Sequence, residues 1–151
     1  MPEMDQIYKI QENLYIGAFW PKLNFDEFKK FGITAIVNLM EVSHYDPTPM
    51  GFKYLHKGFP DDRYPPHSYI KEILEFIDFN IKNGGKVLIH CAMAISRSGG
   101  ITVAWLLKNH SDWSWNDALN YVRKSRLIYP AIEIKESILD YFESLEGKRR
   151  D

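Results

Sequence analysis

The chain has 151 residues, of which 45% are hydrophobic and 26% are charged, and its formal net charge is −1. That length suits one domain with a buried core, and we expect a single domain over residues 1–151. The balanced charge argues against a nucleic-acid or membrane surface, the chain start lacks a signal peptide, and no apolar run reaches membrane-spanning length. The single cysteine excludes an internal disulfide framework and favours a reducing, cytoplasmic compartment.

Strand and helix patterns alternate along the first half of the chain. β-branched and apolar runs predict strands, apolar residues three and four apart predict helices, and glycines mark the ends of both. The predicted elements are strands over 7–10 and 14–16, a helix over about 24–31, strands over 34–39 and 53–56, and a helix carrying Ile70, Ile73, Leu74, Ile77 and Ile81. A loop over 58–66, rich in proline and aspartate, precedes that last helix.

The second half of the chain predicts one more strand, over 86–90, and then three helices. The first helix covers about 98–108, Ser114 is expected to cap the second, and the third carries apolar residues from Ile134 to Leu145. The basic end, 148–150, is expected to be solvated. The order of elements predicts an α/β fold with a central, mainly parallel sheet flanked by helices. Ligands in such folds bind beyond the C-terminal ends of the strands, where Cys91 falls.

The most informative segment joins the strand over 86–90 to the following helix. It places Cys91 directly after the strand and Arg97 six residues later, at the start of the helix. Backbone N–H groups at a helix N-terminus bind anions, and an arginine can hold two oxygens of one anion. The same field favours the thiolate form of a cysteine, which is the nucleophilic form. A lone cysteine is most often a small buried hydrophobic residue, but this context predicts a reactive thiol at the floor of an anion cradle.

These residues carry a family resemblance. The pattern His-Cys-x5-Arg-Ser, from His90 to Ser98, resembles the signature of the cysteine-dependent protein tyrosine phosphatases, and in particular their small dual-specificity group. Segments 13–17, 32–39 and 118–130 also resemble that group, so the similarity extends over nearly the whole chain. The resemblance implies a central, mainly parallel sheet, no metal and no cofactor.

The resemblance also implies a role for each residue of the loop. Cys91 would attack phosphorus and form a phosphocysteine, and Arg97 would bind two phosphate oxygens and stabilise the transition state. Ser98 would donate a hydrogen bond to the sulfur when it leaves, and His90 would orient the loop without acting as a base. The backbone N–H groups of the loop would complete the phosphate-binding cradle, and its residues are Ala92, Met93, Ala94, Ile95, Ser96 and Arg97.

The leaving oxygen needs a proton, so the reaction requires a general acid. The family supplies an aspartate from an upstream loop with a Pro-Asp-x-x-x-Pro pattern, and segment 60–65 places Asp61 at that position. Asp62 remains an alternative, because a shift of one residue changes which side chain faces the pocket. Asp61→Asn is expected to lower turnover strongly while substrate binding survives.

One residue departs from the family pattern. Ala94 occupies a position where the signature usually has glycine, and a Cβ there is unfavourable if the backbone has positive φ. The resemblance predicts a phosphatase acting on phosphotyrosine, and on phosphoserine and phosphothreonine, in protein substrates. The alternative is a phosphate-binding pseudophosphatase or a weakly active variant, because of Ala94. The expected ligands are phosphorylated proteins and phosphate- or sulfate-like anions, with no nucleic acid and no membrane, and the expected state is a monomer.

Overall fold

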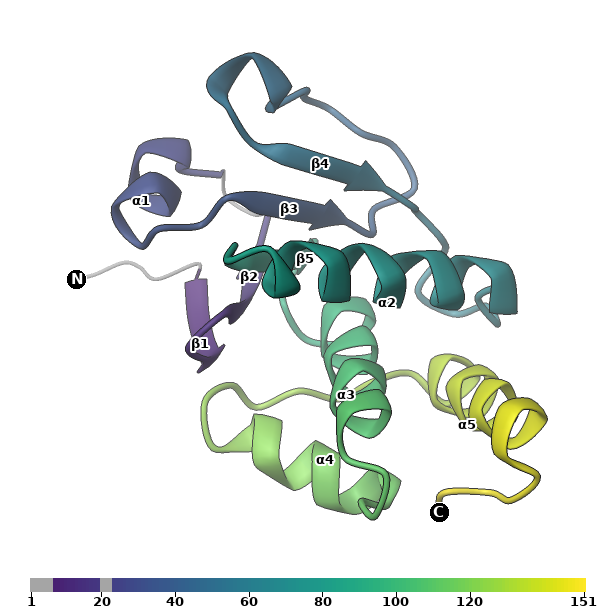
Figure 1. Ribbon diagram of the computed structural model, residues 1–151. Helices are drawn as coiled ribbons and strands as arrows, with labels where there is room; N and C mark the ends of the chain where they lie inside the picture. The colour runs from purple at the N-terminus through teal and green to yellow at the C-terminus, as the bar shows by residue number, and fades with distance from the viewer. Residues whose placement is uncertain (1–6, 20–22) are drawn as a thin grey trace.

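The computed structural model describes residues 7–19 and 23–151, and a five-stranded sheet lies at its centre (Figure 1). The strand order is β1-β2-β5-β3-β4. Only β1 runs antiparallel to its neighbour, while β2, β5, β3 and β4 are parallel. The strands are β1 (Ile7–Gln11), β2 (Leu14–Ala18), β3 (Ala35–Asn38), β4 (Lys53–His56) and β5 (Val87–Cys91). The predicted α/β fold with a mainly parallel sheet is confirmed.

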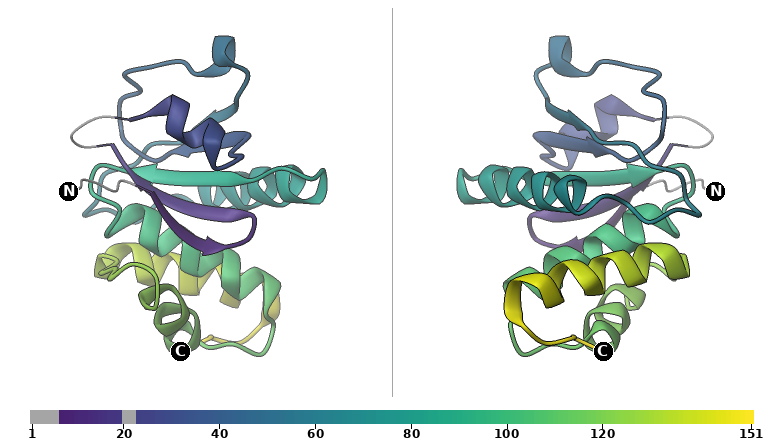
Figure 2. Two further views of the ribbon diagram at one scale, coloured as in Figure 1. Left: turned by 90° about the vertical axis from the view of Figure 1, so that its left-hand side faces the viewer. Right: turned by 90° about the vertical axis from the view of Figure 1, so that its right-hand side faces the viewer.

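The helices cover the two faces of the sheet unequally (Figure 2). The short helix α1 covers one face, and the four longer helices gather on the other side. Asn24 caps α1 by accepting from the Glu27 N–H, and Ser114 forms a capping box with Asp117, as the sequence predicts for Ser114. The helices are α1 (Phe25–Lys30), α2 (His67–Lys82), α3 (Arg97–Asn109), α4 (Trp115–Arg123) and α5 (Ile132–Glu146), and a 3-10 turn spans Thr48–Met50.

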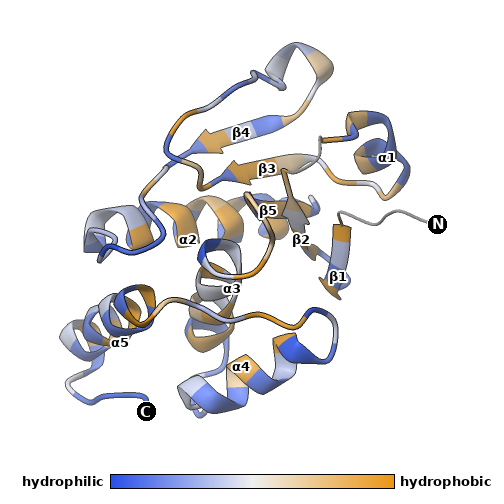
Figure 3. Ribbon diagram, turned by 180° about the vertical axis from the view of Figure 1, so that it is seen from behind, coloured by the Kyte–Doolittle hydropathy of each residue, from blue (hydrophilic) through white to orange (hydrophobic). Residues whose placement is uncertain are grey.

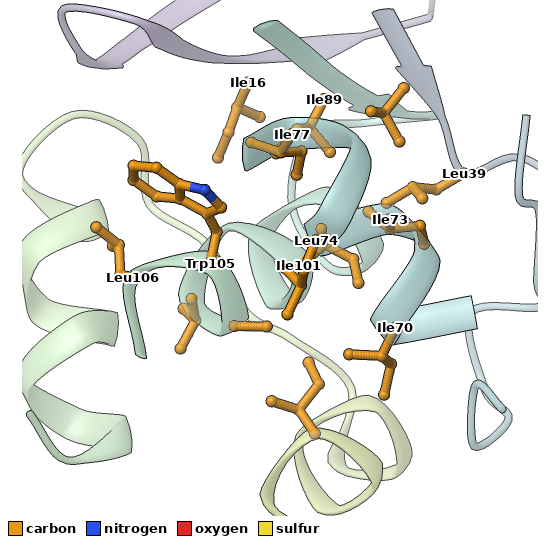
Figure 4. Packing of buried hydrophobic residues seen from close by; sticks show 14 of the residues in the cluster. Ile16, Leu39, Ile70, Ile73, Leu74, Ile77, Ile89, Ile101, Trp105 and Leu106 are labelled. Carbon is orange, nitrogen blue, oxygen red and sulfur yellow. The ribbon is translucent and has the colours of Figure 1, made fainter. Parts of the chain in front are cut away.

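Alternating residues of the central strands belong to two different hydrophobic clusters. In β5, Val87, Ile89 and Cys91 belong to the larger cluster, whereas Leu88 belongs to the smaller one beneath α1. This is the two-residue period expected when both faces of a strand are covered. Figure 4 shows the larger cluster, where Ile89 lies among apolar side chains of α2 and α3. Both faces of β5 are therefore packed, which holds its C-terminal end firmly in place.

The C-terminal segment is only partly the solvated end that the sequence predicts, because Lys148 is exposed but Arg150 is buried. Arg150 is 4% exposed and donates hydrogen bonds to the carbonyl oxygens of Leu107, His110 and Trp113. It also forms an ion pair with Glu146 at 2.8 Å. The prediction was wrong at Arg150 because a basic run has no periodicity that shows what it contacts. Within residues 7–19 and 23–151, no helix is long and apolar enough to span a membrane.

Candidate active site

Cys91 is the last residue of β5, and its thiol lies beside the first turn of α3. The residue is 2% exposed, and its Sγ is 3.2 Å from the Ser98 hydroxyl oxygen and 3.5 Å from the Ser98 backbone nitrogen. These groups can donate to sulfur, and the N-terminus of the 13-residue helix α3 adds its positive dipole end. The sulfur therefore faces two hydrogen-bond donors and the positive end of a helix dipole.

His90 is held on the opposite side of the strand by two polar contacts. Its Nδ1 lies 3.4 Å from the carbonyl oxygen of Cys91, and its Nε2 lies 2.5 Å from the hydroxyl of Tyr45. Burial lowers the pKa of His90 to about 4, so the ring is neutral at neutral pH. A carbonyl can only accept, so Nδ1 carries the proton and Nε2 accepts from the Tyr45 hydroxyl. Burial also raises the pKa of Tyr45, which keeps that donor protonated.

Arg97 connects the cysteine loop to the loop that precedes α2. Its guanidinium donates to the carbonyl oxygen of Phe59 at 3.1 Å, and Phe59 is buried in the larger hydrophobic cluster. Two residues later, Asp61 lines the same cavity as Cys91 and Arg97. The Asp62 side chain is 81% exposed and forms an ion pair with Arg63 instead. Of the two candidate acids, the structure places Asp61 at the cavity.

The cavity over the cysteine has a volume of about 320 Å³. It brings together most of the residues that the sequence singles out, because the two loops leave the parallel strands β5 and β4, on either side of β3, at the same sheet edge. Its lining residues are Asp61, Cys91, Ala92, Met93, Ile95, Ser96, Arg97, Tyr129 and Ala131. Ala94 does not line it. Its φ is +58°, the left-handed region, and its side chain is 0% exposed within the core.

Three contributors to the site were not assigned a role from the sequence. Tyr45 binds His90 from a loop with no periodic pattern, and Tyr129 and Ala131 reach the cavity from the connection between α4 and α5. In the sequence, residues 118–130 carry only a resemblance to a helix and turn that follow the cysteine loop. No spacing rule links residue 129 to residue 91, so only the packing of that connection could identify them.

Comparison with known proteins agrees with this geometry. The model of the family described as "Dual specificity phosphatase, catalytic domain" matches residues 14–144. Dual specificity protein phosphatase 1B of Arabidopsis thaliana is 33% identical over 141 residues, covering 92% of this chain and 83% of that protein. Protein phosphatase Slingshot of Drosophila melanogaster is 29% identical over 147 residues, covering 96% of this chain but only 14% of that protein.

The solved structures show the same fold. Tk-PTP in a glycine-to-alanine mutant form has a TM-score of 0.83 at 28% identity, covering 95% of this chain and 98% of that one. Its active form has a TM-score of 0.75 at 25% identity, and the match covers 97% of this chain and 99% of that one. The chain therefore belongs to the family of dual specificity phosphatase catalytic domains, as its motifs predicted, and falls in the enzyme class of protein phosphatases.

Proposed function

We propose that this chain hydrolyses phosphate monoesters on protein side chains through a phosphocysteine intermediate, without a metal ion. The observation that carries the proposal is a single cavity lined by a cysteine, an arginine and an aspartate, with Ser98 hydrogen-bonded to the cysteine sulfur. These residues supply a nucleophile, an anion clamp, a proton donor and a leaving-group stabiliser.

In the first step, the Cys91 thiolate attacks phosphorus and forms an S–P bond while the P–O bond to the substrate oxygen breaks. Arg97 and the loop N–H groups bind the equatorial oxygens, where negative charge accumulates. The carboxylic acid of Asp61 donates its proton to the leaving oxygen, so the product leaves as a neutral alcohol or phenol.

In the second step, water attacks the phosphocysteine and the Asp61 carboxylate accepts a proton from that water. The S–P bond breaks, inorganic phosphate leaves, and the sulfur keeps the electron pair as a thiolate. The Ser98 hydroxyl, 3.2 Å from Sγ, stabilises that charge. His90 stays neutral throughout and orients the end of β5 through the Cys91 carbonyl.

Family membership supports phosphotyrosine, phosphoserine and phosphothreonine as the substrate groups. The lone thiol supports a reducing, cytoplasmic environment, because the described residues hold no second cysteine that could protect it by forming a disulfide.

The test is hydrolysis of an aryl phosphate in the presence of a metal chelator, followed by phosphopeptides. Wild type should release phosphate, Cys91→Ser should release none, and Asp61→Asn should lose at least about a hundredfold in kcat with little change in KM. Asp62→Asn is the matched control and should retain activity. Release that persists in Cys91→Ser, or a loss confined to Asp62→Asn, would contradict these assignments.

A weakly active or binding-only variant is the second candidate, and Ala94 is the observation that favours it. Its φ of +58° costs an alanine on the order of 1 kcal/mol, which can shift the loop toward another conformation. If the loop is limited in this way, Ala94→Gly should raise kcat/KM for an aryl phosphate. Unchanged kinetics would show that Ala94 does not limit the loop.

A further inference from the structure

The connection between α4 and α5 runs along the outside of the phosphate-binding loop. Figure 3 shows this connection passing beside the start of α3. We call residues 126–131 the strap. Four hydrogen bonds join it to the loop: Arg126 Nη2 donates to Met93 O at 2.9 Å, Arg126 Nε to Ala94 O at 3.1 Å, Tyr129 N to Ile95 O at 3.1 Å, and Ala131 N to Ser96 Oγ at 2.9 Å. Four consecutive loop residues are therefore held from one side.

Three of these bonds determine where the loop amides point. The C=O and N–H of one trans peptide point in opposite directions. Because the carbonyls of Met93, Ala94 and Ile95 face the strap, the N–H groups of the residues that follow them point away from it. Those N–H groups belong to residues 94, 95 and 96, and none of them donates to another protein atom in the described part of the chain. Successive free amides of this kind form an anion-binding nest.

Ala94 makes this loop conformation unfavourable unless other residues stabilise it. It is the one non-glycine among the described residues with positive φ, and its carbonyl is the acceptor for Arg126 Nε. The guanidinium binds two adjacent carbonyls with a rigid fork, which a lysine cannot reproduce. The two bonds oppose any rotation of the peptides on either side of Ala94.

Two further contacts hold the strap in place, one at Arg126 and one at Ile128. The Arg126 guanidinium lies over the Tyr8 ring, 4.6 Å from its centroid. Ile128 is fully buried and packs against Gly99 so closely that a Cβ on Gly99 would lie 2.8 Å from the Ile128 Cβ. The strap can therefore hold the loop against β1 and α3 and does not simply move with it.

We propose that Arg126 is a positioning residue for the anion cradle: it holds the Met93 and Ala94 carbonyls outward so that the loop amides face the phosphate. The proposal rests on the proposed function for its catalytic consequence, but not for its effect on anion binding. It gives the strap a part in binding that lies outside the cysteine motif.

The experiment compares Arg126→Met, Arg126→Lys and the control Lys124→Met, which removes a nearby positive charge that lies over the Tyr121 ring. Binding of inorganic phosphate is measured by calorimetry. Turnover is measured with an aryl phosphate as substrate, and folding is checked by thermal unfolding. Arg126→Met should bind phosphate about tenfold more weakly and lose at least as much in kcat/KM. Arg126→Lys should lose nearly as much, and Lys124→Met should stay within about twofold of wild type.

Adding Ala94→Gly to Arg126→Met separates positioning from charge. Glycine occupies positive φ freely, so the double variant should recover at least about threefold in phosphate binding. Wild-type binding in Arg126→Met, full retention in Arg126→Lys, or no recovery with Ala94→Gly would overturn the proposal. If Arg126→Met does not fold, the comparison rests on Arg126→Lys with and without Ala94→Gly. A wild type that binds phosphate without hydrolysing the ester would refute the proposed function alone.

Discussion

The buried imidazole of His90 makes stability depend on pH in a specific range. The ring is fully buried, and burial lowers its pKa from 6.5 to about 4. Above pH 6.5 both the folded and unfolded states hold a neutral ring, so this group adds no pH dependence there. As pH falls below 6.5 the unfolded chain binds a proton that the folded state does not, and the free energy of unfolding decreases until the pH reaches about 4.

The size of this effect follows from the difference between the two pKa values. About 2.5 pKa units, at about 1.4 kcal/mol per unit, give a full loss of about 3.5 kcal/mol, of which about 3 kcal/mol falls between pH 7 and pH 4 because the folded ring is half protonated at pH 4. Replacing His90 by asparagine removes the titration while keeping a polar side chain. The stability of wild type relative to His90→Asn should therefore decrease by about 3 kcal/mol over this range.

Urea unfolding of both proteins at several pH values between 7 and 4 measures the difference. Carboxylates contribute equally to both chains and cancel in the comparison. His67→Asn, at an exposed position on α2, controls for the loss of an imidazole in general. An NMR titration of the His90 ring in the folded protein gives its pKa directly, even if His90→Asn is too unstable to compare. Parallel stability curves, or a ring that titrates near pH 6.5 while the protein is folded, would refute the reasoning.

Two further predictions concern Ser98 and Arg150. Ser98→Ala removes the hydroxyl that lies 3.2 Å from Sγ, so hydrolysis of the phosphocysteine should slow more than its formation. Rapid-quench kinetics should then show a burst of alcohol product. Steady release without a burst would argue against this role of Ser98. Arg150→Met leaves three carbonyl groups without their donor, so the free energy of unfolding should decrease by about 2 to 3 kcal/mol in urea titrations. The more exposed Arg149→Met is the matched control, and equal losses in both would assign the effect to charge alone.

The strands, the helices and the central motif could be predicted because they depend on residues close together in the chain. Strand 53–56 has the predicted bounds, and β5 and α3 differ from the prediction by one residue at each end. Two-residue alternation and 3.6-residue spacing are local patterns in the sequence. They predict these elements correctly because the residues that the patterns mark as apolar are the ones buried in the folded protein. The Pro-Asp spacing likewise indicated Asp61 before the structure placed it at the cavity.

Other parts of the site depend on contacts between distant residues. Tyr45 meets His90 across 45 positions, and Arg126 meets Ala94 across 32. Neither contact has a spacing rule, because it exists only when separate elements pack side by side. The burial of Arg150 is of the same kind, since its acceptors are carbonyls freed where α3 ends and in the loop that follows.

The sequence by itself determined the fold class, and it predicts Cys91 as the nucleophile, Arg97 and Ser98 as its partners and a short list of acids. The fold class, the reactive cysteine and its arginine follow from local spacing and from the chemistry of side-chain types, whereas the roles of Ser98 and Asp61 follow from the family resemblance. Only the tertiary structure decided which way the peptides around Ala94 face, because a peptide's direction depends on what binds its carbonyl. In this chain the binding group comes from the strap, and no local pattern around the cysteine could reveal it.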